Sequence, residues 1–374
     1  MDSGVQNSSN INQTQPIELG REPEYSVVIR FFLFGVIILV SLVGNIAVIF
    51  ITYRNRQMRT FAYFLIANLA LADVLATLCL PIIIAYLEIT KWVFGEVMCK
   101  LVNPSITVFG VVTSNTLVAI ACDRFRALIF PFKLKPSTSE TRLIIALIWM
   151  IAFLVTLPSY GSRTVTIDGY CLEIYSSDTR QQILYVKIYT TFMFLVNNFI
   201  PLLVILILYI KISMTLAHIT LFPSLHFNRP SSLAHESPGE SPRNSVLLRN
   251  VNTASATKRQ TMERKFIRML LTVVLIFFFC YVPFQVFFLI WSYLDLTKVV
   301  DNKALYYCNH YLHILMWLPT ALNPICYAAL NERYAKYFKR LLRCSFSKLK
   351  QFGTTANPSG YTAASRRKSS PLSV

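Results

Sequence analysis

The sequence predicts an all-α membrane protein with seven transmembrane helices, and three observations lead to this fold class. Of the 374 residues, 54% are hydrophobic and only 14% are charged, whereas a soluble chain carries about 25% charged residues. Seven stretches are apolar over the roughly 20 residues that a helix needs to cross a bilayer. None shows the alternation of barrel strands, which favours helices. The stretches cover 27–53, 61–87, 99–122, 143–160, 185–213, 266–293 and 305–328.

Basic residues are distributed unevenly among the segments between these stretches. The segments 54–60, 123–142, 211–268 and 331–374 contain 27 of the 36 Lys and Arg residues. Because loops rich in Lys and Arg stay in the cytoplasm, we expect a multi-pass protein of the plasma membrane with an extracellular N-terminus. The net charge of +18 then reports membrane topology, and we expect no nucleic-acid partner.

The apolar stretches divide the chain into a bundle with polar ends. We assign 1–26 to an extracellular tail, 27–330 to the bundle and 345–374 to a cytoplasmic tail. Within the bundle, the segment 214–263 is rich in Ser, Pro and Asn. This composition predicts a disordered third intracellular loop, because it offers too few apolar residues to form a core.

The segment 331–344 places aromatic and Leu side chains three and four residues apart, with Lys and Arg between them. This pattern is typical of an amphipathic helix on an anionic leaflet, so membrane lipids are expected partners. Cys344 at its end is a candidate for palmitoylation, with a free cytosolic thiol as the alternative. In the N-terminal tail, Asn7 and Asn12 match the glycosylation sequon.

Three polar residues stand out inside the apolar stretches, where such groups are costly. Asn45 lies in the first stretch, Asp73 in the second and Asn323 in the seventh. An ionised Asp73 needs partners, and the two asparagines are suitable ones. Such a cluster would hold a monovalent cation or change its protonation state. The alternative is a static network that joins helices, and the residues alone do not decide between them.

The extracellular side is predicted to carry a disulfide and a β-hairpin. Cys99 heads the third stretch and Cys171 lies in the loop after the fourth, so both are extracellular and able to pair. Around Cys171, the segment 163–174 alternates β-branched and polar residues on both sides of Asp168-Gly169. This is a strong signal for a hairpin. No pair of cysteines has the spacing of a metal site, and sodium is the only metal that the sequence suggests.

These features come with a series of short motifs, one or more in each apolar stretch and in a fixed order. The motifs are Gly44-Asn45, Leu69-Ala70-Leu71-Ala72-Asp73, Cys99, Asp123-Arg124-Phe125, Trp149, Pro201 with Tyr209, Phe277 with Cys280-Tyr281-Val282-Pro283, and Asn323-Pro324-Ile325-Cys326-Tyr327. Together they make residues 27–343 resemble the rhodopsin-like (class A) G-protein-coupled receptors. The hairpin makes neuropeptide receptors the most similar group.

The resemblance implies a mechanism, in which an extracellular agonist swings the sixth span outward about Pro283 and opens a cleft for a heterotrimeric G protein. Arg124 would be released from its resting partners. Arrestin and receptor kinases would be further cytoplasmic partners. The implied switch residues are Asp123, Arg124, Phe125, Tyr209, Glu263, Tyr281, Pro283, Asn323, Pro324 and Tyr327. The implied sodium pocket consists of Asn45, Asp73, Thr113 and Asn323, and we expect no cofactor beyond this allosteric ion.

Four residues depart from the family pattern. Phe125 replaces the usual Tyr, and Tyr281 stands where a Trp that senses the ligand is usual. Ser114 takes the place of a branched aliphatic residue, and Pro319 is a second proline in the seventh span. These departures leave the class unchanged but put the usual relay from ligand to the sixth span in doubt.

The ligand is expected to be a neuropeptide, with a lipid or other small organic molecule as the alternative. Ile106 occupies the position of the Asp that pairs with amines, which argues against an amine ligand. A rim of outer acids would attract a basic, amidated peptide: Glu88, Glu96, Asp168, Glu173, Asp178, Asp295 and Asp301. Family positions suggest as pocket residues Ile106, Thr107, Tyr189, Gln285, His310 and His313. We find no HExxH, P-loop or GxSxG motif and expect no enzyme.

Overall fold

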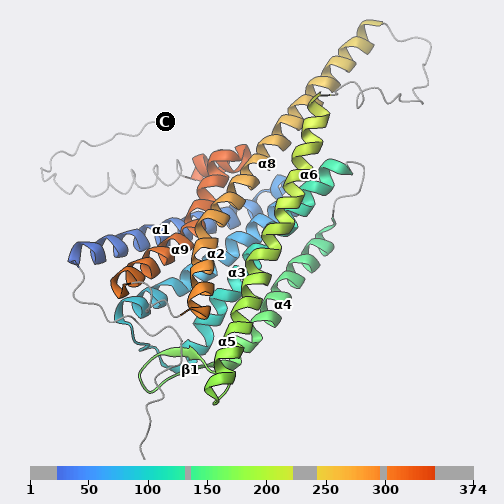
Figure 1. Cartoon of the computed structure of the whole chain (residues 1–374). Coiled ribbons are helices and arrows are strands. Elements are labelled where there is room, and N and C mark those ends of the chain that lie inside the picture. The colour runs from blue at the N-terminus through green and yellow to red at the C-terminus, as the bar shows by residue number, and fades with distance from the viewer. Residues whose placement is uncertain (1–22, 131–135, 222–241, 295–300, 342–374) are drawn as a thin grey trace, which may run out of the picture.

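The fold is a bundle of long helices with one small hairpin at one end (Figure 1). The computed structural model describes residues 23–130, 136–221, 242–294 and 301–341. The glycosylation candidates Asn7 and Asn12 and the palmitoylation candidate Cys344 lie outside these residues.

Each of the seven predicted spans falls within a helix of the structure. The helices are α1 Glu24–Arg54, α2 Phe61–Ile89, α3 Gly95–Ile129, α4 Thr138–Ser162, the continuous α5 Thr179–Phe194, η2 Leu195–Phe199 and α6 Ile200–Leu221, then α8 Pro242–Tyr293 and α9 Asn302–Leu330. A short 3-10 turn, η1 Arg56–Met58, follows α1. Six of these segments are long and apolar enough to cross a membrane. The seventh, α9, is 29 residues long, and His310, His313 and Asn323 make it more polar.

The helices close into a ring. In chain order α1 packs on α2, α2 on α3 and α3 on α4, while α9 packs on both α8 and α1. The contact between α1 and α9 depends on Gly44, because a Cβ at this position would lie 2.5 Å from Cγ of Pro324. The absent side chain therefore lets the two backbones approach closely.

The predicted hairpin and disulfide are both present at one end of the bundle. Strands β1 Arg163–Val165 and β2 Cys171–Glu173 are antiparallel, with Val165 opposite Cys171. Gly169 has a φ of +82°, which favours glycine in the turn. Cys171 is bonded to Cys99 at the start of α3. We call this end of the bundle the hairpin end and the opposite end the Arg124 end.

The predicted loop over 214–263 is too long in both directions. Helix α6 continues to Leu221 and α8 already begins at Pro242, so helix covers much of the segment (Figure 1). The prediction weighed the Ser, Pro and Asn content of the whole segment. It overlooked that Pro is favoured at the first helical position and that good helix formers such as Leu, Ala, Arg, Lys and Glu follow Pro242.

A further helix over 332–341 matches the predicted amphipathic segment at 331–344 within the described residues. Its first turn is capped by Asn331, whose Oδ1 accepts the backbone N–H groups of Arg333 and Tyr334. The Tyr334 side chain is fully buried, and its hydroxyl lies 2.8 Å from Oγ1 of Thr52 in α1. The helix is thus anchored on the bundle through its own apolar face.

Candidate functional site

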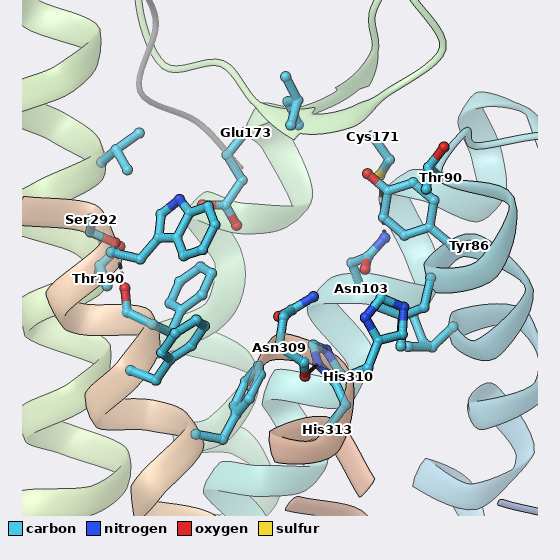
Figure 2. Close-up of a pocket in the computed structure, with 18 of the residues that line it drawn as sticks. Tyr86, Thr90, Asn103, Cys171, Glu173, Thr190, Ser292, Asn309, His310 and His313 are labelled. Atoms are coloured by element: carbon cyan, nitrogen blue, oxygen red, sulfur yellow. Dashed lines mark hydrogen bonds between the residues drawn. The ribbon is translucent and has the colours of Figure 1, made fainter. Parts of the chain in front are cut away.

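A cavity of about 280 Å³ lies beneath the hairpin (Figure 2). Its walls are the ends of α2, α3, α5, α8 and α9, together with β2. Figure 2 shows Ser292 and Thr190 on one side, Tyr86, Thr90 and His310 on the other, and Asn309 between them. An aromatic wall from α8 consists of Phe284, Phe287, Phe288 and Trp291. The sequence analysis did not select these residues, although their spacing of three and four after Pro283 was a usable signal.

A second cavity of about 290 Å³ continues toward the middle of the bundle and shares lining residues with the first. It reaches Asp73, Thr113 and Asn323, which the sequence assigns to a sodium pocket. The two cavities bring together all six predicted pocket residues. Ile106, Thr107, Tyr189 and Gln285 line the deeper part, His310 the outer part, and His313 both.

Two histidines on α9 are held in the same way by the backbone one turn before them. Nδ1 of His310 is 2.9 Å from the backbone oxygen of Tyr306, and Nδ1 of His313 is 2.8 Å from that of Asn309. A carbonyl oxygen only accepts hydrogen bonds, so each Nδ1 carries the proton. Nε2 of His310 is buried without a hydrogen-bond partner among the described residues.

An ion pair between the two strands of the hairpin lines the cavity. Nη2 of Arg163 in β1 donates to Oε1 of Glu173 in β2 at 3.0 Å, and the hydroxyls of Ser159 and Tyr175 donate to the same carboxylate. Burial, reinforced by the charge of Glu173, raises the pKa of the Tyr175 phenol well above its ordinary value. Tyr175 therefore stays protonated and keeps donating to Glu173.

The predicted acidic rim is largely neutralised by its own neighbours. Four of its acids are engaged: Glu88 by Arg30, Glu96 by Lys100, Glu173 by Arg163, and Asp178 by the backbone N–H of Arg180. Asp168 at the tip of the hairpin and Asp301 before α9 are exposed. Asp295 lies outside the described residues. Within the described residues, Glu173 is the rim acid that lines both cavities, whereas Asp168 and Asp301 are exposed to solvent outside them.

The polar cluster around Asp73 is present, with an arrangement that the sequence did not specify. Nδ2 of Asn323 donates to Oδ2 of Asp73 at 2.9 Å, which brings the second and seventh spans together. Asn45 does not contact the Asp73 carboxylate. Its Nδ2 instead donates to the backbone oxygen of Thr320 at 2.8 Å and to the hydroxyl of Ser41 at 3.2 Å. The Oδ1 atoms of Asn45 and Asn323 are buried without a hydrogen-bond partner among the described residues.

At the Arg124 end, Arg124 is paired with its neighbour Asp123, as predicted. Its guanidinium also lies 4.6 Å from the ring centroid of Phe266 on α8, a cation–π contact. The side chain of Glu263, the second predicted partner, lies outside the described residues. Tyr209 and Tyr327 are buried, and their hydroxyls make no hydrogen bond to any residue the structure describes.

The most deeply buried charge among the described residues was not among the predicted site residues. Arg30 in α1 has no exposed surface, and its Nε and Nη2 donate to the two oxygens of Glu88 at the end of α2, at 3.0 and 2.8 Å. Nη2 also lies 3.4 Å from the hydroxyl of Tyr306, which lines the outer cavity. The available signal was an arginine inside an apolar stretch, near the same end as a glutamate of the next stretch.

Comparison with known proteins identifies the family. The model of the seven-transmembrane receptors of the rhodopsin family matches residues 44–327. The chain belongs to this family. It is 30% identical to a substance-P receptor of Aquarana catesbeiana over 92% of this chain and 77% of that receptor. The human substance-P receptor is 28% identical over 92% of this chain and 78% of its own length. A RYamide receptor of Tribolium castaneum is 28% identical over 83% of this chain and 80% of its own length.

The family membership settles several expectations at once. The chain is a multi-pass membrane protein and a class A G-protein-coupled receptor, which are receptors and not enzymes.

Proposed function

We propose that this receptor binds an extracellular peptide and passes the signal to a heterotrimeric G protein at the Arg124 end. The observation that carries the proposal is the paired cavity, which runs from the hairpin to Asp73 and combines an aromatic wall with polar groups. Pockets of this kind bind through apolar contact and a few placed polar groups. The relatives named as substance-P and RYamide receptors support a peptide as the ligand.

The exposed Asp168 and Asp301 favour a ligand with positive charge, and Glu173 places a carboxylate on the wall of both cavities. A basic, amidated peptide carries such a charge. The hairpin end would then be extracellular and the receptor would lie in the plasma membrane, as the loop charges indicate. A lipid or small organic ligand is the second candidate, supported by the largely apolar walls of the cavity.

On the cytoplasmic side, agonist binding would shift the population toward a state with α8 swung outward about Pro283. Arg124 would leave Asp123 and Phe266, and Tyr209 and Tyr327 would support it in the open cleft, where their hydroxyls are available. Arrestin and receptor kinases would bind the same side, and lipids would contact the 332–341 helix.

A sodium ion fits the polar cluster in the middle of the bundle. The residues offer the oxygen ligands that a hard cation prefers: the Asp73 carboxylate, the Thr113 hydroxyl and the unpartnered Oδ1 atoms of Asn45 and Asn323. A bound sodium ion would favour the resting state, and these residues would hold it there.

The ligand class is tested by applying a panel of basic and neutral peptides, with and without C-terminal amides, to cells that report G-protein activation. We expect basic peptides to signal. The double variant Asp168→Asn, Asp301→Asn should lose potency by up to about fivefold per charge, since an exposed ion pair contributes about 0.2–1 kcal/mol. Glu96→Gln is the matched control, because Glu96 is paired with Lys100 and does not line the cavity. A lipid extract that signals where micromolar peptides do not would replace the peptide with a lipid.

Coupling is tested with Arg124→Ala, in receptor molecules counted at the cell surface. We expect G-protein activation to be lost while the active peptide still binds. If the variant loses binding or never reaches the surface, Arg124 has a structural role instead.

A further inference from the structure

Two of the four departures from the family pattern, Ser114 and Tyr281, are joined by a single side chain. The hydroxyl of Ser114 on α3 donates to Oδ1 of Asn197 at 2.9 Å. Nδ2 of the same asparagine, in η2, donates to the hydroxyl oxygen of Tyr281 on α8 at 3.0 Å. One amide therefore connects three helices through two hydrogen bonds. We call Ser114, Asn197 and Tyr281 the polar relay.

Gly110 provides the space for the polar relay. A Cβ at this position would lie 2.8 Å from the hydroxyl oxygen of Tyr281 and 3.3 Å from Nδ2 of Asn197. The Tyr281 ring stacks on Phe277, with centroids 4.8 Å apart and an interplanar angle of 18°. The missing side chain thus lets the Tyr281 hydroxyl reach α3 while its ring remains packed on α8.

The π turn η2 directs Asn197 into the bundle. In this turn the N–H of Ile200 bonds to the oxygen of Leu195, five residues back, and Pro201 follows directly. Proline has no N–H to donate, so the preceding turn is free to widen. Asn197 is 3% exposed, whereas Leu195 and Phe199 on either side are 39% and 53% exposed. The wide turn therefore buries two amides, Asn197 and Asn198, in a helix that otherwise presents apolar side chains outward.

Part of the polar relay also lines the deeper cavity. Asn197, Tyr281 and Gly110 line the deeper cavity together with Gln285, one turn beyond Tyr281 on α8. Tyr281 lies two residues before Pro283, the point about which α8 would swing. A ligand that reaches this level of the cavity meets two side chains of the polar relay, Asn197 and Tyr281. It can form hydrogen bonds with them in place of the existing ones.

We propose that Asn197 is a positioning residue for signalling. Through Ser114 and Tyr281 it holds α8 against α3 in the resting conformation, and an agonist releases α8 by taking over one of its hydrogen bonds. This inference rests on the proposed function, because it assumes a receptor in which α8 moves. The contact between α8 and α3 then differs from the packing of an apolar core, because it depends on two buried hydrogen bonds, one of which the agonist must replace.

The test uses variants that remove one hydroxyl and keep the rest of the side chain. Tyr281→Phe and Ser114→Ala each break one bond of the polar relay. Their matched controls are Tyr160→Phe and Ser105→Ala, whose hydroxyls lie 2.9 Å apart between α4 and α3 and do not involve α8. Each receptor is reconstituted in lipid nanodiscs, and nucleotide exchange on a purified G protein is measured without ligand.

We expect Tyr281→Phe to raise ligand-independent exchange about fivefold, the factor that corresponds to one lost buried hydrogen bond of about 1 kcal/mol. Ser114→Ala should act in the same direction. In the double variant, ligand-independent exchange should be faster than in either single variant. Its fold-increase should be smaller than the product of the two single fold-increases, because both bonds share the Asn197 amide. The control variants should leave exchange unchanged. Equal exchange in Tyr281→Phe, Ser114→Ala and the controls would overturn the proposal and leave the polar relay a structural feature.

A second measurement separates this outcome from a failure of the proposed function. Spin labels at the exposed positions Met214 on α6 and Arg268 on α8 report the distance between these helices, after Cys122, Cys308 and Cys344 are replaced by Ser. Tyr281→Phe should add a longer distance that the wild type and Tyr160→Phe lack. A longer distance without exchange supports the polar relay and contradicts coupling to that G protein. An unchanged distance overturns the polar relay.

Discussion

Two buried polar clusters in the same bundle differ in how completely their groups are used. Near the hairpin end, each nitrogen of the Arg30 guanidinium has a partner among Glu88, Ser26 and Tyr306. In the middle of the bundle, Asp73 bonds to Asn323, while the Oδ1 atoms of Asn45 and Asn323 have no partner in the described chain. A saturated cluster fixes one arrangement, whereas one with spare acceptors is able to bind an ion or rearrange.

The Arg30 cluster should therefore be the more sensitive to the loss of one member. We expect Arg30→Met to lower the free energy of unfolding by about 3 kcal/mol, because Glu88 keeps its buried charge without a partner. The effect is measured as a drop in the thermal unfolding midpoint of the purified receptor. The double variant Arg30→Met, Glu88→Met should recover most of the loss. If Arg30→Met unfolds at the same temperature as the wild type, the Arg30 cluster is not more sensitive to the loss of a member than the Asp73 cluster.

The Asp73 cluster is probed by moving one of its walls. Gly44→Ala places a methyl group 2.5 Å from Cγ of Pro324, and overpacking of this kind costs about 1–3 kcal/mol. We expect a lower unfolding midpoint and a longer separation between α1 and α9. Gly35→Ala on the same helix is the control, because a Cβ there meets no atom within 4 Å. A receptor that tolerates both changes equally would show that the close contact at Gly44 is not needed.

A sodium effect would distinguish the clusters directly. We expect sodium chloride, compared with choline chloride at equal ionic strength, to stabilise the wild type by about 1 kcal/mol at about five times the dissociation constant of the ion. Asp73→Asn should abolish this difference, because the amide has lost the negative charge. Glu88→Gln should keep it. If sodium stabilises the Asp73→Asn variant as much as the wild type, the ion binds elsewhere or acts nonspecifically.

The smallest effect is expected from an ion pair outside both clusters. Lys265 and Glu332 lie 2.5 Å apart, but their side chains are 51% and 64% exposed. We expect Glu332→Gln to change the free energy of unfolding by less than about 0.5 kcal/mol, because water screens exposed pairs. Thermal unfolding at low and high salt measures it. A loss comparable to that of Arg30→Met would mean that burial does not account for the difference between the clusters.

The elements that could be predicted are those specified by neighbouring residues. The seven spans follow from local hydropathy, and the hairpin follows from Asp168-Gly169 between alternating residues. The residues predicted to line a ligand pocket were chosen because family motifs fix their positions along each helix. All six line the two cavities.

What could not be predicted depends on the rotation and approach of whole helices. The pairing of Arg30 with Glu88 requires α1 and α2 to meet with particular faces. The position of Asn197 requires one widened turn, which rotates every later residue of the helix. The helical ends at Leu221 and Pro242 were lost because composition was averaged over the whole segment, while helix formation depends on the local sequence.

The length of α8 gives its movement a mechanical consequence. The helix continues from Pro283 back to Pro242, well beyond the other helices of the bundle (Figure 1). At 1.5 Å per residue this arm is about 60 Å long, so a tilt of about 10° at Pro283 would displace its tip by about 10 Å. The helix would therefore act as a lever, with a short arm beside the cavity and a long arm that extends past the Arg124 end. A change of a single hydrogen bond at its pivot would thus be converted into a displacement as large as the width of a helix.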